Sequence, residues 1–137
     1  MMEGKSLREQ GNNFFKQKDY IKAIEAYSEG ILLTTDKNEL LLLYSNRAQC
    51  YLNINYPIYA LSDCHIVQEL NPTHIKTLVR MAQAFHTIKD YQTEVKTQMT
   101  LFSLTKEKEY FAKWLEARKL QDAPKPKDDQ LKIINPK

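Results

Sequence analysis

Glycine is scarce in this sequence, with three residues in a chain of 137. A β-sandwich or β-barrel would need more turn residues than this, so the composition favours an all-α fold. Long apolar runs are also missing, and no stretch approaches the roughly 18 residues of a membrane-spanning helix. Apolar residues nevertheless make up 42% of the chain, which is enough for the hydrophobic core of one domain.

A strong charge of one sign is absent as well. The net charge is +3, which does not suggest the broad phosphate binding of a nucleic-acid protein. Basic and aromatic residues do mix in the stretch KEYFAKW, but the aromatic residues recur at core spacing, so nucleic-acid binding is the weaker alternative. The N-terminal residues MMEGKSLREQ lack the apolar core of a signal peptide, which favours a cytosolic protein without membrane attachment.

Residues that could carry catalysis or bind a metal are few and scattered. Cys50 and Cys64 form no CxxC pair and have no histidine at metal-binding spacing, so we interpret them as small buried thiols. The three histidines form no motif such as HExxH, and there is no GxSxG motif, P-loop or glycine-rich phosphate loop. We therefore expect no enzyme activity, no metal and no cofactor.

A repeat of two-helix units runs along most of the chain. Small residues recur at a nearly constant interval, at Gly11, Ala48 and Ala82. An aromatic residue follows three positions later in each unit, at Phe14, Tyr51 and Phe85. Small residues allow two antiparallel helices to cross closely, and the aromatic residues fill the adjacent space. A single helix pair cannot bury its apolar face alone, so we expect the units to stack.

Residues that favour turns and helix starts support this division into two-helix units. Polar breaks come shortly before the expected starts of the second helices, at Tyr20, Pro57 and Tyr91. Proline suits the first turn of a helix, where its missing N–H is not needed. The segment TTDKNE, residues 34–39, is expected to be a longer loop. The predicted units cover residues 4–37, 41–74 and 75–108, followed by a capping helix at 109–121 and a linker or disordered tail at 122–137.

The units resemble the tetratricopeptide repeat (TPR). The signature is carried in the first unit by Gly11, Phe14, Ala23 and Tyr27, and in the second by Ala48, Tyr51, Ala60 and Pro72. The third unit departs from it, because Glu94 and Gln98 stand where a small residue and an aromatic residue are expected. The resemblance implies a right-handed superhelical solenoid of three TPR helix pairs plus a capping helix, with the first helix of each pair lining the concave side.

Cations and amides are expected to converge on that concave side. Arg8 and Asn12 are four residues apart, as are Lys76 and Arg80, so each pair projects from one face of its helix. Asn46 lies on the helix between them, within the otherwise apolar stretch LLLYSNRAQCYL. Cations and amide donors together suit a carboxylate, because charge-assisted hydrogen bonds are the stronger kind. Arg47 should face away from this surface and form a salt bridge.

These five residues resemble the dicarboxylate clamp of TPR co-chaperones. Such domains hold the C-terminal Glu-Glu-Val-Asp tail of cytosolic heat-shock chaperones of the 90-kDa and 70-kDa classes. The resemblance implies a clamp formed by Arg8, Asn12, Asn46, Lys76 and Arg80. Arg8 departs from the family pattern, which has lysine there. The neighbouring groove positions would be Phe15, Gln49, Asn53 and Gln83.

The resemblance further implies a monomeric adaptor in the cytoplasm, with the chaperone tail as its partner. A solvated basic face without a dedicated ligand is the plainest alternative for the clamp residues. Another is a TPR scaffold that binds an internal helix or an unrelated acidic segment, which would use the same groove without needing a free C-terminus.

Overall fold

The protein folds into seven α-helices in the computed structural model, which describes residues 4–124. The helices are α1 (Gly4–Lys16), α2 (Tyr20–Leu33), α3 (Lys37–Asn53), α4 (Pro57–Leu70), α5 (Ile75–Thr87), α6 (Tyr91–Thr105) and α7 (Lys108–Gln121). This part of the chain contains no strand, so the predicted all-α class is confirmed. Within the same residues, no helix combines the length and the apolar character needed to cross a membrane.

The turns inside the three helix pairs share one backbone shape. Each contains a residue in the left-handed region, namely Lys18 with φ 62°, Asn55 with φ 66° and Lys89 with φ 63°. The second helices begin at the predicted residues, immediately after the capping residue that follows each turn. Asp19 and Asp90 cap α2 and α6 by accepting a backbone N–H with their carboxylates.

The connection between the first two pairs is shorter than predicted. The loop ends at Asp36, whose Oδ1 accepts the backbone N–H groups of Asn38 and Glu39 at 2.8 and 3.3 Å. This N-cap starts α3 at Lys37, so the expectation of a loop through Glu39 was wrong. Glu39 therefore lies on the first turn of α3, beside α1, where its position affects the functional site.

Small residues lie at the helix crossings, as predicted. Ala23, Ala48 and Ala60 are completely buried. Gly11 faces the ring of Tyr27, and a Cβ atom added there would overlap the ring carbons. The small side chains thus allow the close approach of α1 to α2 and of α3 to α4.

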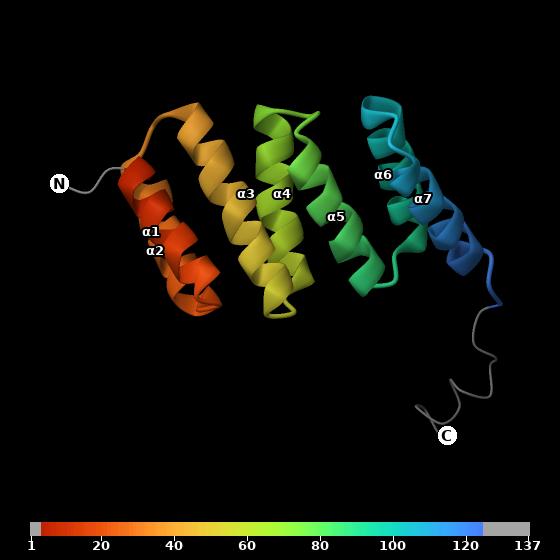
Figure 1. Ribbon diagram of the computed structural model, residues 1–137, viewed down its shortest axis with the longest axis horizontal. Coiled ribbons are helices and arrows are strands. Elements are labelled where there is room, and N and C mark those ends of the chain that lie inside the picture. Colours follow the sequence, from red (N-terminus) through yellow and green to blue (C-terminus); the bar gives the residue numbers. More distant parts are fainter. Residues whose placement is uncertain (1–3, 125–137) are drawn as a thin grey trace, which may run out of the picture.

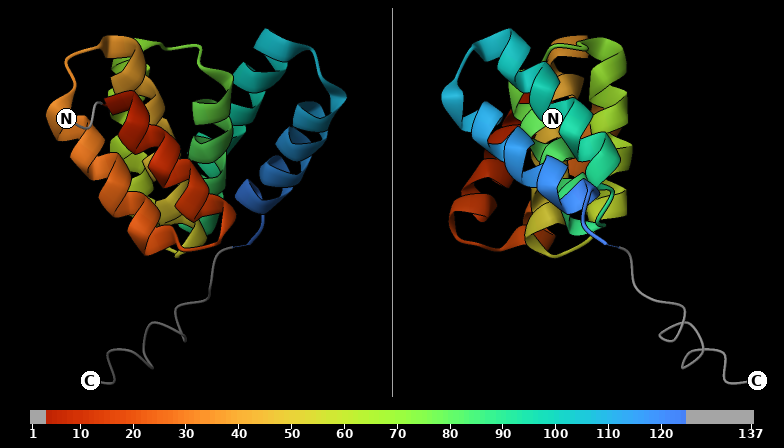
Figure 2. Two further views of the ribbon diagram at one scale, coloured as in Figure 1. Left: turned by 60° about the vertical axis from the view of Figure 1, so that its left-hand side comes forward. Right: turned by 90° about the vertical axis from the view of Figure 1, so that its right-hand side faces the viewer.

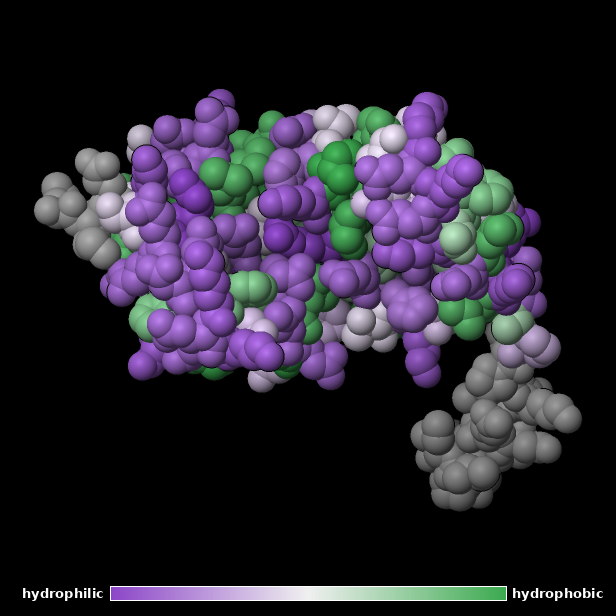
Figure 3. Space-filling view, viewed as in Figure 1, coloured by the Kyte–Doolittle hydropathy of each residue, from purple (hydrophilic) through white to green (hydrophobic). Residues whose placement is uncertain are grey.

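The helices form two layers (Figures 1 and 2). Helices α1, α3 and α7 lie in front of α2, α4 and α6 in Figure 1, and the side view in Figure 2 places α1 and α7 on one side with α4 on the other. The first helices of the pairs, α1, α3 and α5, lie next to one another in this order, and residues of all three line one surface. This face is predominantly hydrophilic (Figure 3).

The last two helices complete the stack. Helix α7 buries Tyr110 and Ala117 against α6, while Phe111 and Leu115 each remain 42% exposed. The seventh helix therefore covers the last repeat with one side only. Of the predicted tail at 122–137, residues 125–137 lie outside the described part of the chain.

Candidate functional site

A groove of about 390 Å³ crosses the face formed by α1, α3 and α5. All five predicted clamp residues line it: Arg8, Asn12, Asn46, Lys76 and Arg80. Phe15 and Gln49, predicted as groove positions, line it as well. Side chains from three helices therefore meet at one place although they are widely separated in the chain.

The first clamp cation is already paired inside the protein. Arg8 donates from Nε to Oε2 of Glu39 at 2.9 Å and from Nη2 to Oε1 at 3.1 Å. The hydrogen bond with Glu39 raises the pKa of Arg8, so the guanidinium stays charged. This pair leaves the remaining N–H groups of Arg8 as donors for a ligand.

The two amides of the clamp are held by a hydrogen-bond network. The Oδ1 atom of Asn12 accepts from the hydroxyl of Tyr27 at 2.5 Å and from Nδ2 of Asn46 at 3.1 Å. Burial raises the pKa of the Tyr27 phenol, which stays protonated and acts as a donor. Because the oxygen of Asn12 is occupied, its NH₂ group is the part available to a bound carboxylate.

Arg80 forms the floor of the groove. Its Nη1 donates to the carbonyl oxygen of Ser45 at 2.9 Å and also to the Ser45 hydroxyl, and its Nε donates to Oε1 of Gln49 at 3.2 Å. Burial lowers the pKa of Arg80, but arginine remains charged at any physiological pH. A half-buried cation bound only to neutral acceptors favours an anion, because no carboxylate of the described residues compensates it.

Lys76 is the exposed cation at the rim. It lies four residues before Arg80 on α5, and none of the ion pairs found within residues 4–124 involves it. Its ammonium group can therefore move to a ligand without breaking an internal contact. Next to it, burial and then the charges of Arg80 and Lys76 lower the pKa of His74.

Two of the predicted groove positions lie elsewhere. Asn53 accepts a hydrogen bond from Nε2 of Gln49 at 2.7 Å and is not among the groove-lining residues. Gln83 lines a second cavity, between α5, α6 and α7. Asn53 lies seven residues after Asn46 on α3, and Gln83 lies three residues after Arg80 on α5, so both are further along their helices than the clamp residues.

Arg47 faces away from the groove, as predicted. It binds Asp63 on α4 through Nε at 2.9 Å and Nη2 at 2.7 Å, and it donates to the Ser28 hydroxyl at 3.0 Å. Asn46 and Arg47 are adjacent in sequence, yet one lines the groove and the other joins helix pairs on the opposite side of α3. The predicted salt bridge of Arg47 is confirmed.

Sequence reasoning missed three groups that shape the groove: Tyr27, Glu39 and Ser45. The sequence pattern gives Tyr27 only a role in the repeat signature and predicts a loop at Glu39. An N-cap aspartate three residues before Glu39 was the signal that could have placed it on α3. Ser45 lies one position from Asn46, and no sequence pattern marked it as the acceptor for Arg80.

Metal-binding side chains and cysteines are the other residues of the described chain that could carry chemistry. No group of three or more metal-binding side chains occurs in residues 4–124. Cys50 and Cys64 are free and buried, as predicted, and burial raises the pKa of each thiol to about 12. Such thiols are protonated and poorly reactive at neutral pH.

Three antiparallel helix pairs, a seventh helix and a groove on the first helices define a TPR domain, and the predicted resemblance is confirmed. The first TPR domain of Spaghetti (RPAP3), solved bound to the HSP90 peptide SRMEEVD, has a TM-score of 0.81 and 25% identity, covering 88% of this chain and 94% of that one. The second TPR domain of human RPAP3, in complex with the HSP70 peptide SGPTIEEVD, has a TM-score of 0.74 and 26% identity, with coverages of 84% and 94%.

Curated relatives extend far beyond the matched region. Protein unc-45 homolog B of Xenopus laevis is 41% identical over 78 residues, which are 57% of this chain and 8% of the relative. The chain therefore spans no more than about a tenth of the length of the UNC-45 relatives that it matches. No protein-family model matches the sequence.

Proposed function

We propose that residues 4–121 form a protein-interaction module, a co-chaperone adaptor that binds the C-terminal Glu-Glu-Val-Asp tail of cytosolic heat-shock chaperones. The tail would come from the 90-kDa class, the 70-kDa class or both. The observation that carries this proposal is the meeting of three cationic and two amide side chains in one groove. TPR domains of similar fold bind peptides of this kind, which supports the same function here.

Binding would proceed by recognition of charge and of hydrogen-bond acceptors. The terminal main-chain carboxylate and the side chain of the last Asp would lie between Asn12, Asn46 and the cations Lys76 and Arg80. The free N–H groups of Arg8 would complete the clamp. Phe15 and Gln49 would contact the residues immediately before the terminal Asp.

The tail would be bound with modest affinity. Few residues become ordered, and the groove is open to water, so we expect a Kd on the order of micromolar, about −8 kcal/mol. Affinity should fall with salt, because exposed charges are screened over about 10 Å at 0.1 M ionic strength. We further propose that the domain acts without catalysis, as a monomer in the cytoplasm.

A scaffold that binds an internal acidic segment is the competing function. It would use the same cations but would not need a free terminal carboxylate. The half-buried Arg80 and the paired amides favour the terminal carboxylate, because they offer several donors converging on one place.

Calorimetric titration with a peptide ending in Met-Glu-Glu-Val-Asp, with a free or an amidated C-terminus, tests the proposal. Micromolar binding that is lost on amidation would support the carboxylate clamp. Equal binding of both forms would favour the scaffold for internal segments. Absence of binding by either form, with a folded protein, would refute the proposed function.

A further inference from the structure

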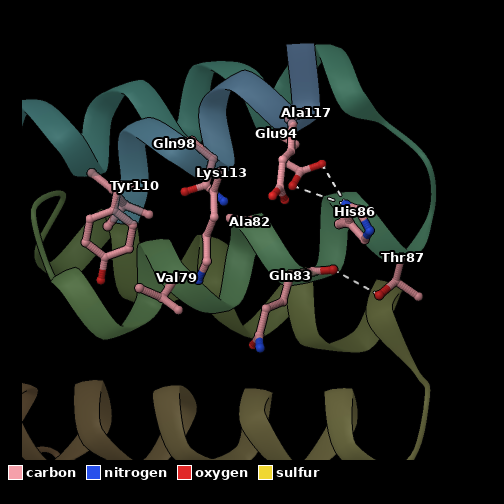
Figure 4. A pocket seen from close by; sticks show the side chains of 12 residues that line it. Val79, Ala82, Gln83, His86, Thr87, Glu94, Gln98, Tyr110, Lys113 and Ala117 are labelled. Atoms are coloured by element: carbon pink, nitrogen blue, oxygen red, sulfur yellow. Dashed lines mark hydrogen bonds and ion pairs between the residues drawn. The ribbon is translucent and has the colours of Figure 1, made fainter. Parts of the chain in front are cut away.

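A second cavity, of about 330 Å³, lies beside the clamp between α5, α6 and α7 (Figure 4). We call it the upstream pocket; the residues used below to describe it are Gln83, His86, Glu94, Gln98, Lys113 and Glu116. Helix α5 contributes to both sites, with Lys76 and Arg80 in the clamp groove and Gln83 and His86 in the upstream pocket. The two sites are therefore neighbours along one helix.

The pocket arises where the third unit departs from the repeat. Gln98 occupies the same place relative to Ala82 as Tyr27 does relative to Gly11 in the first unit. The ring of Tyr27 fills the space against Gly11 and is completely enclosed, at 1% exposure. Gln98 has no ring to fill the equivalent space, and the cavity remains.

Gln98 leaves an acceptor without a partner in this place. The residue is only 4% exposed, and its Oε1 atom forms no hydrogen bond with any described residue. Buried polar atoms are nearly always paired, because an unpaired one has lost its water without compensation. An N–H donor entering the pocket would supply the missing bond.

Glu94 adds a buried carboxylate to the same pocket. It replaces the small residue of the repeat, since it follows Ala82 at the same interval as Ala23 follows Gly11. Its side chain is 7% exposed, whereas that of its partner His86, which bonds it through Nδ1 at 3.0 Å, is 56% exposed. A carboxylate has about four acceptor positions, so this single partner leaves most of them available.

The other charged side chains that line the pocket form no ion pair with Glu94. Lys113 and Glu116 line it from α7, and both are exposed. Among the ion pairs within residues 4–124, Glu94 is joined only to His86, and Lys113 takes part in none. A buried carboxylate with only a solvent-exposed imidazole as partner favours an additional cation.

We propose that the upstream pocket is a second subsite, which binds a basic side chain of an extended peptide whose C-terminal carboxylate occupies the clamp. This inference rests on the proposed function and adds sequence preference to it. An arginine fits best, because its planar guanidinium carries five N–H donors and can reach the Glu94 carboxylate and Gln98 Oε1 together.

The spacing of the two sites limits the position of that arginine to the residues shortly before the terminal Asp. Along α5, the two sites are separated by about 4.5 Å from Arg80 to Gln83 and by about 15 Å from Lys76 to His86, at 1.5 Å per residue. Five residues of an extended peptide reach about 17 Å. The HSP90 peptide SRMEEVD has its arginine five residues before the terminal Asp, whereas the HSP70 peptide SGPTIEEVD has no basic residue. The pocket therefore selects tails of the first type.

Calorimetry with SRMEEVD and with the same peptide carrying citrulline in place of arginine tests this subsite. Citrulline keeps the shape of the side chain and removes its charge. We expect the unmodified protein to bind the arginine peptide at least fivefold more tightly. Glu94→Gln, which keeps the hydrogen-bonding capacity toward His86, should reduce this ratio to nearly one.

Gln98→Tyr is a second variant, which restores the aromatic residue of the repeat and fills the pocket. It should also bring the ratio close to one, without weakening the citrulline peptide. Thermal unfolding would establish that both variants are folded. The comparison of the two peptides on the unmodified protein does not depend on either variant.

The outcomes separate the subsite from the clamp. If the unmodified protein binds both peptides equally and loses both on C-terminal amidation, the subsite is refuted and the clamp is supported. An arginine preference unchanged in both variants would place the basic side chain elsewhere and refute the role of the pocket. If neither peptide binds, the proposed function and the subsite fail together.

Discussion

Arg8 and Glu39 form a two-point ion pair between α1 and α3, with N···O distances of 2.9 and 3.1 Å. The side chains are 19% and 18% exposed, so water reaches the pair only in part. The groove proposed to bind an acidic peptide thus carries a carboxylate of its own chain on one of its cations. Glu39 lowers the positive charge of the groove and would compete with an acidic ligand for Arg8.

Glu39→Gln should therefore strengthen binding of a Glu-Glu-Val-Asp peptide, by about threefold to tenfold at low salt. The variant releases Arg8 and removes one repulsive charge. The gain should shrink as salt screens the groove. Titration calorimetry at low and at high salt measures both effects, and weaker binding by the variant would instead mean that Glu39 orients Arg8 for the ligand.

Lys76→Ala should reduce peptide affinity at least tenfold, which is about 1.4 kcal/mol. Lys76 is exposed and has no ion pair among the described residues, so the change should leave the melting temperature nearly unaltered. Lys96→Ala, an exposed lysine on α6, is the matched control and should bind normally. Equal affinity of the two variants would remove Lys76 from the clamp.

Tyr27→Phe should weaken binding by about twofold to fivefold. The hydroxyl of Tyr27 holds Oδ1 of Asn12, and without it the amide loses the hydrogen bond that orients it toward the groove. The loss of one hydrogen bond should cost the fold about 1 kcal/mol. Tyr59→Phe, at an exposed tyrosine, serves as the control for calorimetry and thermal unfolding. A normal affinity in the Tyr27 variant would show that Asn12 is oriented by Asn46 alone.

Ala60→Leu should destabilise the domain by about 1–3 kcal/mol, because the larger side chain forces α3 and α4 apart. Ala60 is completely buried at this crossing. Ala112→Leu introduces the same side chain at an exposed position of α7 and should change the melting temperature little. If both variants have the same melting temperature as the unmodified protein, the assignment of Ala60 to a close helix crossing is incorrect.

The stability of the domain should fall as the pH decreases below about 6.5, the ordinary pKa of histidine. Burial, and then the charges of Arg80 and Lys76, lower the pKa of His74 in the folded protein. As the pH falls, His74 therefore binds a proton in the unfolded chain before it does so in the folded protein. The free energy of unfolding is highest above about pH 6.5 and decreases as the pH falls from there through the lowered pKa of His74. In His74→Asn the melting temperature should change less between neutral and mildly acidic pH, and an equal change would assign the effect to other groups.

The helix pairs could be predicted because they depend on short-range spacing, whereas prediction of the clamp also needed the resemblance to TPR domains, which implied that the first helices share one face. Gly11 and Ala48 mark crossings by their size, and their aromatic neighbours follow three residues later. Arg8 with Asn12, and Lys76 with Arg80, share a face because four residues are about one turn of a helix. These relationships hold for any sequence that forms the helices, so they can be read before the tertiary structure is known.

Other features depend on how the helices lie against each other. The all-α repeat follows from the order of the amino acids, and the resemblance to TPR domains implied that the five residues proposed to bind a carboxylate share one groove. The contact of Glu39 with Arg8, the bond of Tyr27 to Asn12 and the cavity that Gln98 leaves beside the clamp emerge only in the folded chain. Contacts between helices depend on their relative shift and crossing angle, because all the packed side chains determine these together.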